Sequence, residues 1–337
     1  MANAAILKLT TELQLIEKLL PEVRPDADLL RGGTQDEELL DRLFSNDMAR
    51  CIAAARAAHE AHQFRDALIA SFDLLQHARD RYRLLIGSRR MHKELVREFV
   101  RVFTLLLAPF CPHYAEHVWE LLGNKDSIMH AAWPRGPPGA ETEDAVLSRV
   151  SSYLDATLTL VRIQHEKSKR GGAKGGGKGG GKDSGKDADK EGEAGPASLI
   201  IFVAREYLEW QAETLRVMSA ASAAGASLDK DFKKGLLAHA ALQPFLDGNP
   251  QAKKSLLPFV QFKIDELHAR GLEALEQTLP FDEADVLVAC KEALTADLAL
   301  QHLEVAAWPP TPDRVAALPA VGKLAPPTPG NPTCFFY

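Results

Sequence analysis

Apolar residues recur at steps of three and four through the first 166 residues of this 337-residue chain, which is the period of an amphipathic helix. Residues that end helices separate the stripes, as at Pro21, Gly87 and Pro109. Each stripe is about one helical face wide, so each helix must bury that face against another. The predicted helices carry the stripes Ile6–Leu20, Leu40–Ala55, Leu68–Leu85, Leu95–Leu106, Pro112–Leu122 and Leu147–Val161. Residues 1–166 are therefore expected to form an antiparallel helical bundle with short connections.

Two of these helices have recognisable start signals. Thr34 and Glu37 have the spacing of a capping box ahead of the second stripe. Pro112 stands where the first turn of a helix tolerates proline, and Gly123 is expected to close that helix.

Residues 167–196 contain no apolar periodicity and are rich in glycine and lysine. Such a segment cannot bury enough apolar surface to offset the entropy lost on ordering, so we predict a flexible linker. Its residues Lys174, Lys178 and Lys182 are candidates for non-specific contacts with nucleic-acid phosphates. Simple solvation of a linker is the alternative interpretation.

Strand-like and helical patterns mix in residues 197–308. The runs Ser198–Val203 and Leu300–Ala307 have the length and residue types of strands, and Ala274–Leu279 is a weaker strand candidate. The predicted helices between them are Tyr207–Met218, Lys230–Leu246 with a break near Gln243-Pro244, Ala252–Ala269 and Asp282–Leu298. This predicts a small α/β domain, followed by a proline-rich, irregular tail over residues 309–337. The fold class is therefore mainly α.

Composition narrows the class of protein. The formal net charge is −6, so a nucleic-acid surface would have to be a local patch rather than a field of the whole protein. The four cysteines are widely spaced and include no CxxC pair, which favours a reducing compartment over a secreted disulfide scaffold. No run approaches about 18 apolar residues, and the N-terminal residues do not resemble a secretion signal. We expect a cytoplasmic protein with no membrane partner.

One segment of this acidic chain is basic. Between Arg79 and Arg101, eight basic residues stand against three acidic ones, a local net charge of +5. A nucleic-acid surface is one interpretation, and a solvated helix face with i,i+4 ion pairs is the other. The candidate phosphate ligands are Arg79, Arg83, Arg89, Arg90, Lys93 and Arg97. Arg89 and Arg90 are the strongest, because a turn between helices lets a side chain reach a nucleic-acid backbone without disrupting packing.

Motifs for catalysis and metal binding are incomplete. Gly180 and Gly185-Lys186 have the spacing of a phosphate-binding loop, but Asp187 replaces the hydroxyl residue that would hold magnesium. The Cys-x-His-x3-His spacing that begins at Cys111 offers at most three zinc ligands, so packing and capping roles are favoured there. The residues therefore assign no catalytic group, no metal site and no cofactor to this chain.

Two adjacent motifs carry a family resemblance. The segment Leu105–Gly123 contains APFCPHYAEHVW, which resembles the APFxPHxxEExW signature of the anticodon-binding helical domain in class I aminoacyl-tRNA synthetases. The segment Lys125–Pro134 contains DSIMHAAWP, which resembles the DSIMNASWP segment of eukaryotic cytosolic leucyl-tRNA synthetases. Further matches at Ile200–Trp210, Phe281–Glu283 and Leu303–Val305 extend the resemblance over most of residues 1–308. The motif residues with expected structural roles are Pro109, Phe110, Pro112, His113, Glu116, Trp119 and Trp133.

The resemblance implies the C-terminal portion of such a synthetase, which would hold tRNA-Leu mainly through phosphate and shape contacts. The HIGH and KMSKS motifs of class I catalysis do not occur in the chain, and the family's editing domain is also absent. We therefore expect no leucine activation by this chain alone. ATP and Mg would serve only a missing catalytic half, which is an expected partner together with other synthetases. The outermost C-terminal extension is also expected to be missing.

Two alternatives stay open at this point. The chain could be a non-catalytic tRNA-binding or scaffold module in a multi-synthetase assembly. It could also be the corresponding domain of a valyl or isoleucyl enzyme, which the DSIMHAAWP segment argues against.

Overall fold

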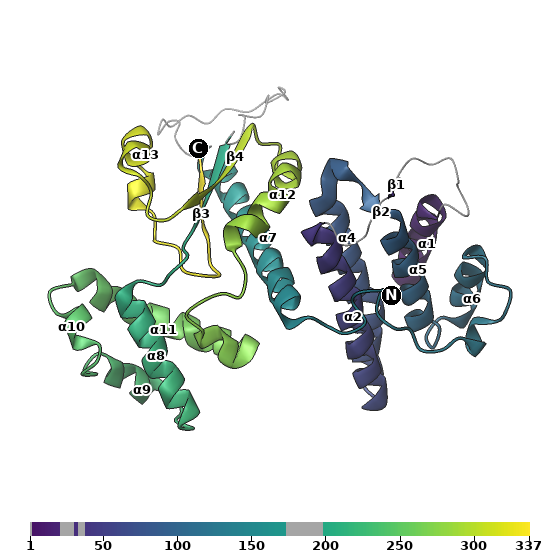
Figure 1. Ribbon diagram of the computed structural model, residues 1–337, viewed down its shortest axis with the longest axis horizontal. Coiled ribbons are helices and arrows are strands. Elements are labelled where there is room, and N and C mark those ends of the chain that lie inside the picture. The colour runs from purple at the N-terminus through teal and green to yellow at the C-terminus, as the bar shows by residue number, and fades with distance from the viewer. Residues whose placement is uncertain (1, 21–29, 33–37, 173–197) are drawn as a thin grey trace, which may run out of the picture. The chain divides into compact units, whose positions relative to one another are not determined.

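The protein is mainly helical and divides into two compact units (Figure 1). The computed structural model describes residues 2–20, 30–32, 38–172 and 198–337. The first unit comprises Met1–Ser198 and Asp285–Leu303, and the second comprises Leu199–Ala284 and Glu304–Tyr337. The expected fold class, a helical bundle followed by a small α/β domain, is confirmed. No described helix combines the length and the apolar character that a membrane span requires.

The first unit is a helical bundle in which α2 packs against α4, α5 and α7. A π-helical segment, Ile69–Leu74, joins α3 to α4, and a turn of 3-10 helix, Gly87–Arg89, follows α4. The two-residue strands β1 (Leu30–Arg31) and β2 (Met91–His92) pair in parallel. The helices are α1 (Ala2–Leu19), α2 (Leu39–Glu60), α3 (Phe64–Leu68), α4 (Leu75–Ile86), α5 (Lys93–Leu107), α6 (Pro112–Leu121), α7 (Ala145–Gly172) and α12 (Glu283–Asp297).

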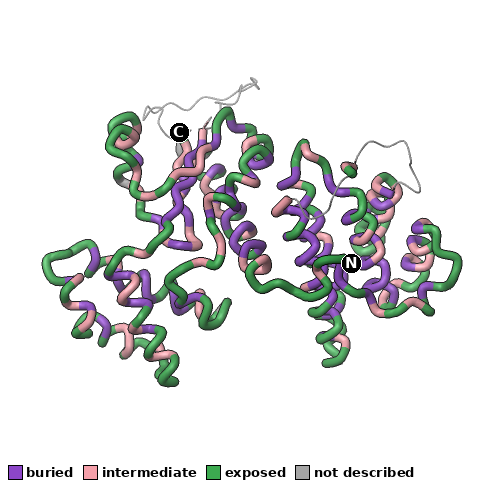
Figure 2. Tube along the Cα trace, in the orientation of Figure 1, coloured by how far each residue is buried: buried purple, intermediate pink, exposed green. Residues whose placement is uncertain are grey.

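The core of the bundle consists of residues that the apolar stripes predict. Phe44 of α2 stacks on Tyr82 of α4 with ring centroids 4.6 Å apart, and Phe99 and Phe103 of α5 lie 5.7 Å apart. Figure 2 marks such buried positions along the bundle helices. Ile6 is an exception, because this first residue of the α1 stripe is exposed while Ile16 and Leu20 at its other end are buried.

The predicted helix ends agree with the structure at Gly87, Pro112 and Gly123. Gly87 and Gly123 have φ values of +53° and +85°, a region that costs glycine little, and Pro112 occupies the first turn of α6. The capping pair Thr34 and Glu37 lies outside the described residues, and α2 begins at Leu39.

The boundary predicted at residue 166 is wrong for the end of α7. This helix continues to Gly172, so residues 167–172, expected in the linker, are helical. Lysine and arginine are good helix formers, and cations suit the C-terminal end of a helix dipole. The remaining predicted linker, with Lys174, Lys178 and Lys182, lies outside the described residues.

The second unit contains a three-stranded sheet in the order β4-β3-β5. Its central strand β3 (Ser198–Val203) agrees with the prediction, and β4 spans His302–Ala307. The third strand, β5 (Thr333–Phe336), pairs antiparallel with β3, so that Ile200 lies opposite Phe335. The prediction of an irregular tail is therefore wrong. Five consecutive residues of β3 are buried, and β5 supplies hydrogen bonds to its second edge.

The tail also contains a short helix, and the helices of the second unit differ in detail from the prediction. The break predicted at Gln243-Pro244 lies earlier, between α9 and α10, because Pro244 occupies the first turn of α10. The predicted strand Ala274–Leu279 is wrong: Gly271–Leu275 form 3-10 helix, and Leu275 packs into a helical core cluster. The remaining helices are α8 (Glu209–Ala223), α9 (Lys230–Leu236), α10 (Gln243–Leu246), α11 (Pro250–Arg270) and α13 (Pro312–Ala317).

The helix α12 belongs to the first unit although the sequence pattern assigns it to the second domain. Residues 285–303 group with the bundle by their contacts, while residues 199–284 form part of the second unit. A helix far along the chain thus completes the bundle.

Candidate nucleic-acid interface

The fold buries the first two arginines of the basic segment 79–101. Arg79 is 5% exposed, and its Nη1 donates to the carboxylate of Glu12 on α1. Its Nε donates to Asp80 at 3.1 Å, and its guanidinium lies 5.4 Å from the ring centre of Phe99. Arg79 therefore holds α1 on the bundle. Its assignment as an exposed phosphate ligand is corrected, because reaching a phosphate would leave the buried Glu12 carboxylate without its arginine and with only the hydrogen bond from Gln76.

Arg81 lies in a second buried ion pair, with Asp47 of α2. Its Nη1 also donates to Asp155 at 2.8 Å and to the carbonyl oxygen of Ser151 at 3.0 Å, and its Nη2 donates to the Ser151 hydroxyl at 2.9 Å. These contacts join α2, α4 and α7. Sequence reasoning missed Glu12 and Asp47, because each lies on another helix and its pairing with an arginine is not visible in a local pattern.

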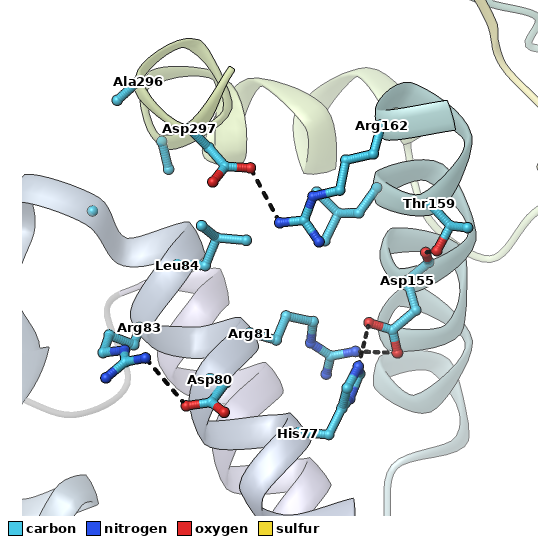
Figure 3. Close-up of a pocket in the computed structure, with 13 residues that line it drawn as sticks. His77, Asp80, Arg81, Arg83, Leu84, Asp155, Thr159, Arg162, Ala296 and Asp297 are labelled. Carbon is cyan, nitrogen blue, oxygen red and sulfur yellow. Dashed lines mark hydrogen bonds and ion pairs between the residues drawn. The ribbon is translucent and has the colours of Figure 1, made fainter. Parts of the chain in front are cut away.

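Arg83 faces a cleft of about 610 Å³ lined by α4, α7 and α12 (Figure 3). Its side chain is 54% exposed and lies 3.5 Å from Asp80. Across the cleft, Arg162 pairs with Asp297 at 3.1 Å, and His77 lies 3.8 Å from Asp155. Each of these basic side chains thus has a carboxylate neighbour, so the cleft does not present a uniformly basic surface.

Arg89 does not project into solvent as its position in a turn suggests. Its Nη1 donates to Glu38 at 3.0 Å, and its Nη2 donates to the carbonyl oxygens of Leu85 at 3.3 Å and Ala289 at 3.0 Å. The side chain therefore ties the end of α4 to the start of α2 and to α12. This role corrects the expectation that Arg89 is a leading phosphate ligand.

Arg90, Lys93 and Arg97 are the candidate residues of the basic segment that remain exposed beside α5. We call these three residues the α5 strip. Lys93 and Arg97 stand four residues apart on α5 and therefore share a helical face, and Arg90 precedes the helix with a φ of +66°. Arg97 also borders a hollow of about 130 Å³ that Glu94, Glu98 and Trp119 help to line.

The two family motifs are joined by contacts between α6 and the turn that follows it. Glu116 accepts hydrogen bonds from the Ser127 hydroxyl and, at 3.1 Å, from the N–H of Ile128. Trp119 Nε1 donates to the carbonyl oxygen of Asp126 at 3.1 Å. The buried side chain of Ile128 packs with Leu105, Ala108 and Ala115, and Trp119 lies against this cluster. The expected structural role of Glu116 and Trp119 is therefore to fix this turn.

The remaining motif residues surround the junction of α2, α5 and α6. The rings of Phe110 and Trp133 lie 5.5 Å and 5.7 Å from the ring of His59, and Arg56 lies 5.9 Å from the Trp133 ring centre. Pro109 and Pro112 stand at the end of α5 and the start of α6 and, like His113, are exposed. In the described part of the chain, no cluster of three or more His, Cys, Asp and Glu residues is arranged to hold a metal ion.

Replacing Glu116 by alanine should open the turn at Ser127–Ile128 while the bundle stays folded. We expect the exchange rate of the Ile128 amide hydrogen to rise by roughly 3- to 30-fold, because its acceptor is lost. Hydrogen exchange measured by NMR would show this. Glu120→Ala, on the same helix, serves as the control and should leave that amide unchanged.

In the wild-type protein, protection of the Ile128 amide from exchange should depend on pH through the same Glu116 carboxylate. The hydrogen bonds from Ser127 and Ile128 lower the pKa of Glu116 below its usual value. The carboxylate of Glu116 therefore stabilises the turn fully at pH values above its unfolded-state pKa. This stabilisation is lost as pH falls through the lowered folded-state pKa. If protection of the Ile128 amide were lost between neutral pH and the ordinary pKa of a glutamate side chain, the role of Glu116 in this turn would be contradicted.

Comparison with known proteins identifies the class to which the bundle belongs. Residues 41–171 match the family model of the anticodon-binding domain of tRNA ligase. This part of the chain, which includes α5, α6 and both motifs, belongs to that family.

The similarity to individual proteins is more specific. The chain is 34% identical over 341 residues to the cytoplasmic leucine–tRNA ligase of Arabidopsis thaliana, covering 99% of this chain and 30% of that protein. It is also 34% identical over 313 residues to the cytoplasmic leucine–tRNA ligase of Pongo abelii, covering 90% of this chain and 24% of the relative. A leucine–tRNA ligase of Aeropyrum pernix is 34% identical over 104 residues, which are 31% of this chain. The family resemblance is thus confirmed, and the chain corresponds to a portion of these ligases.

Proposed function

We propose that this chain binds tRNA-Leu as the tRNA-handling portion of a cytoplasmic leucine–tRNA ligase. The observation that supports this most is the anticodon-binding family match over residues 41–171, within which the α5 strip remains exposed. The similarity to leucine ligases over nearly the whole chain supports leucine as the amino acid. Leucylation itself, with its ATP and Mg, would require a catalytic portion, because the HIGH and KMSKS motifs do not occur in this sequence.

Phosphate contacts are the mode of binding that the α5 strip suits. Exposed lysine and arginine side chains that lie close together can each neutralise an RNA phosphate and release counterions. The buried Arg79 and Arg81 cannot contribute in this way. Binding should therefore depend strongly on salt, with the contribution of the basic segment concentrated in the α5 strip.

Replacing all three residues of the α5 strip by alanine should weaken tRNA binding and flatten its salt dependence. Each lost phosphate contact reduces the slope of log affinity against log salt by about 1, so we expect a reduction of about 2 to 3. The measurement is fluorescence anisotropy of labelled tRNA-Leu over a range of salt concentrations.

A matched control replaces three exposed cations of the second unit, Arg216, Lys234 and Lys253, by alanine. This variant loses the same net charge at another place. If both variants lose the same slope of log affinity against log salt, the effect comes from total charge. The proposal that the α5 strip contacts tRNA would then be contradicted.

A scaffold module that binds proteins rather than tRNA is the competing function. It would retain a catalytic portion or another synthetase without retaining labelled tRNA at low salt. Comparison of tRNA-Leu with tRNA-Val and tRNA-Ile addresses the remaining alternative, and we expect the tightest binding for tRNA-Leu. The chain alone should give no leucine-dependent ATP–pyrophosphate exchange.

A further inference from the structure

Helix α12 contacts the bundle at the end of α4, about 200 residues earlier in the chain. The Ser88 hydroxyl donates to Glu292 at 2.7 Å, and Arg89 donates to the carbonyl oxygen of Ala289 at 3.0 Å. Further along the helix, Asp297 pairs with Arg162 of α7. Three polar contacts thus hold α12 on the turn that follows α4 and on α7.

The packing beneath these contacts is close. A Cβ atom added to Gly87 would lie 3.4 Å from the Cβ of Ala293, an ordinary van der Waals distance, so the chain at Gly87 lies directly against α12. Cys290 is 0% exposed, and Leu294 and Leu287 are also buried. Val288, in contrast, is 58% exposed. One face of α12 is therefore buried and another faces solvent.

The thiol of Cys290 lies on the buried side of α12. Burial raises the pKa of Cys290 to about 12, and the charged groups that act on it in the opposite direction are Arg89 and Arg81 of the bundle. Because a thiol that is buried and protonated reacts slowly, the labelling rate of Cys290 reports whether the helix is docked.

We propose that the turn of 3-10 helix after α4, formed by Gly87, Ser88 and Arg89, is together with Arg162 a binding surface whose occupant is α12 of the same chain. Docking of α12 in the bundle depends on these non-covalent contacts, so it should persist after the chain is cut between α7 and β3. Residues 199–284 are then an insertion between two helices of one domain. Arg89 is a positioning residue of this surface.

The test uses the full chain with a protease site introduced among residues 175–181. After cleavage, the wild-type pieces should co-elute in gel filtration at micromolar concentration. Ala293→Asp places a charge in the buried contact and should separate the pieces. Val288→Asp adds the same charge on the exposed face of the same helix and should leave them together.

Thiol labelling of the uncleaved chain provides a second readout, with the Cys290 peptide identified by mass. Ala293→Asp should speed labelling of Cys290 by at least about tenfold, and Val288→Asp should not. Circular dichroism shows whether the Ala293→Asp variant folds. If it does not, the double variant Ser88→Ala and Glu292→Gln takes its place, because it removes one hydrogen bond of the docking surface. This double variant should speed labelling of Cys290 about 2- to 5-fold.

The proposal is overturned by separation of the wild-type pieces after cleavage. It is also overturned if Ala293→Asp and Val288→Asp have the same effect on co-elution, because the association of the pieces would then not depend on the buried face of α12. Unchanged labelling of Cys290 in the folded Ser88 and Glu292 double variant would remove this surface as the docking site.

Discussion

Replacing Arg81 by alanine should lower the free energy of unfolding by about 3–5 kcal/mol, the largest effect that we expect from a charged residue of this chain. The change leaves the carboxylate of Asp47, which is 0% exposed, with Arg50 at 3.2 Å as its remaining ion-pair partner. It also removes the hydrogen bonds to Ser151 and Asp155 that tie α4 to α7. Urea unfolding followed by circular dichroism would measure the loss.

Arg83→Ala is the matched control, since this arginine stands two residues later on the same helix and its ion pair with Asp80 is exposed. Its effect should stay within about 0.5 kcal/mol. The double change Arg81→Met with Asp47→Asn should recover much of the loss, because it removes both buried charges together. A loss below about 1 kcal/mol in Arg81→Ala would contradict the buried ion pair.

Phe103→Ala should destabilise the protein by a similar amount, about 3–5 kcal/mol. Phe103 is 0% exposed, and its ring lies 5.6 Å from Phe72 and 5.7 Å from Phe99 at the centre of the bundle. Truncation removes buried apolar surface and leaves a cavity that surrounding side chains fill only in part. Thermal and urea unfolding should both show the change.

Phe64→Ala provides the comparison, because this phenylalanine is 57% exposed at the start of α3. We expect a change of no more than about 0.5 kcal/mol. Equal effects of the two phenylalanine changes would mean that the bundle core is not centred on Phe103.

The sequence predicts the core of the bundle well, because the signal there is local. Phe99 and Phe103 stand four residues apart, so their shared face follows from helical periodicity, and both are buried. Gly87 and Pro112 mark helix ends for reasons of backbone geometry that depend on single residues. Rules of this kind require no knowledge of distant contacts.

The partners of buried charges could not be predicted in the same way. Arg79 and Arg83 have similar surroundings in the sequence, yet Arg79 is buried because Glu12, 67 residues earlier, meets it. The strand β5 and the docking of α12 likewise depend on contacts between segments more than a hundred residues apart. Counting the charges of residues 79–101 therefore overstated the accessible basic surface.

The candidate interface was consequently predicted in part. Four of the six candidates in the basic segment are exposed, namely Arg83, Arg90, Lys93 and Arg97, and the last three form the α5 strip. Arg83 lies beside Asp80 in the cleft between α4, α7 and α12, whereas Arg79 and Arg89 have structural roles. Whether the α5 strip contacts tRNA stays a prediction.

The most direct test of the proposed function is the affinity of the purified chain for labelled tRNA-Leu as a function of salt. We predict saturable binding at low salt that weakens roughly 15- to 40-fold between about 50 and about 200 mM salt, as expected for two to three phosphate contacts. Absence of binding at low salt, or an affinity that does not change with salt, would contradict the proposal that this chain holds tRNA through its phosphates.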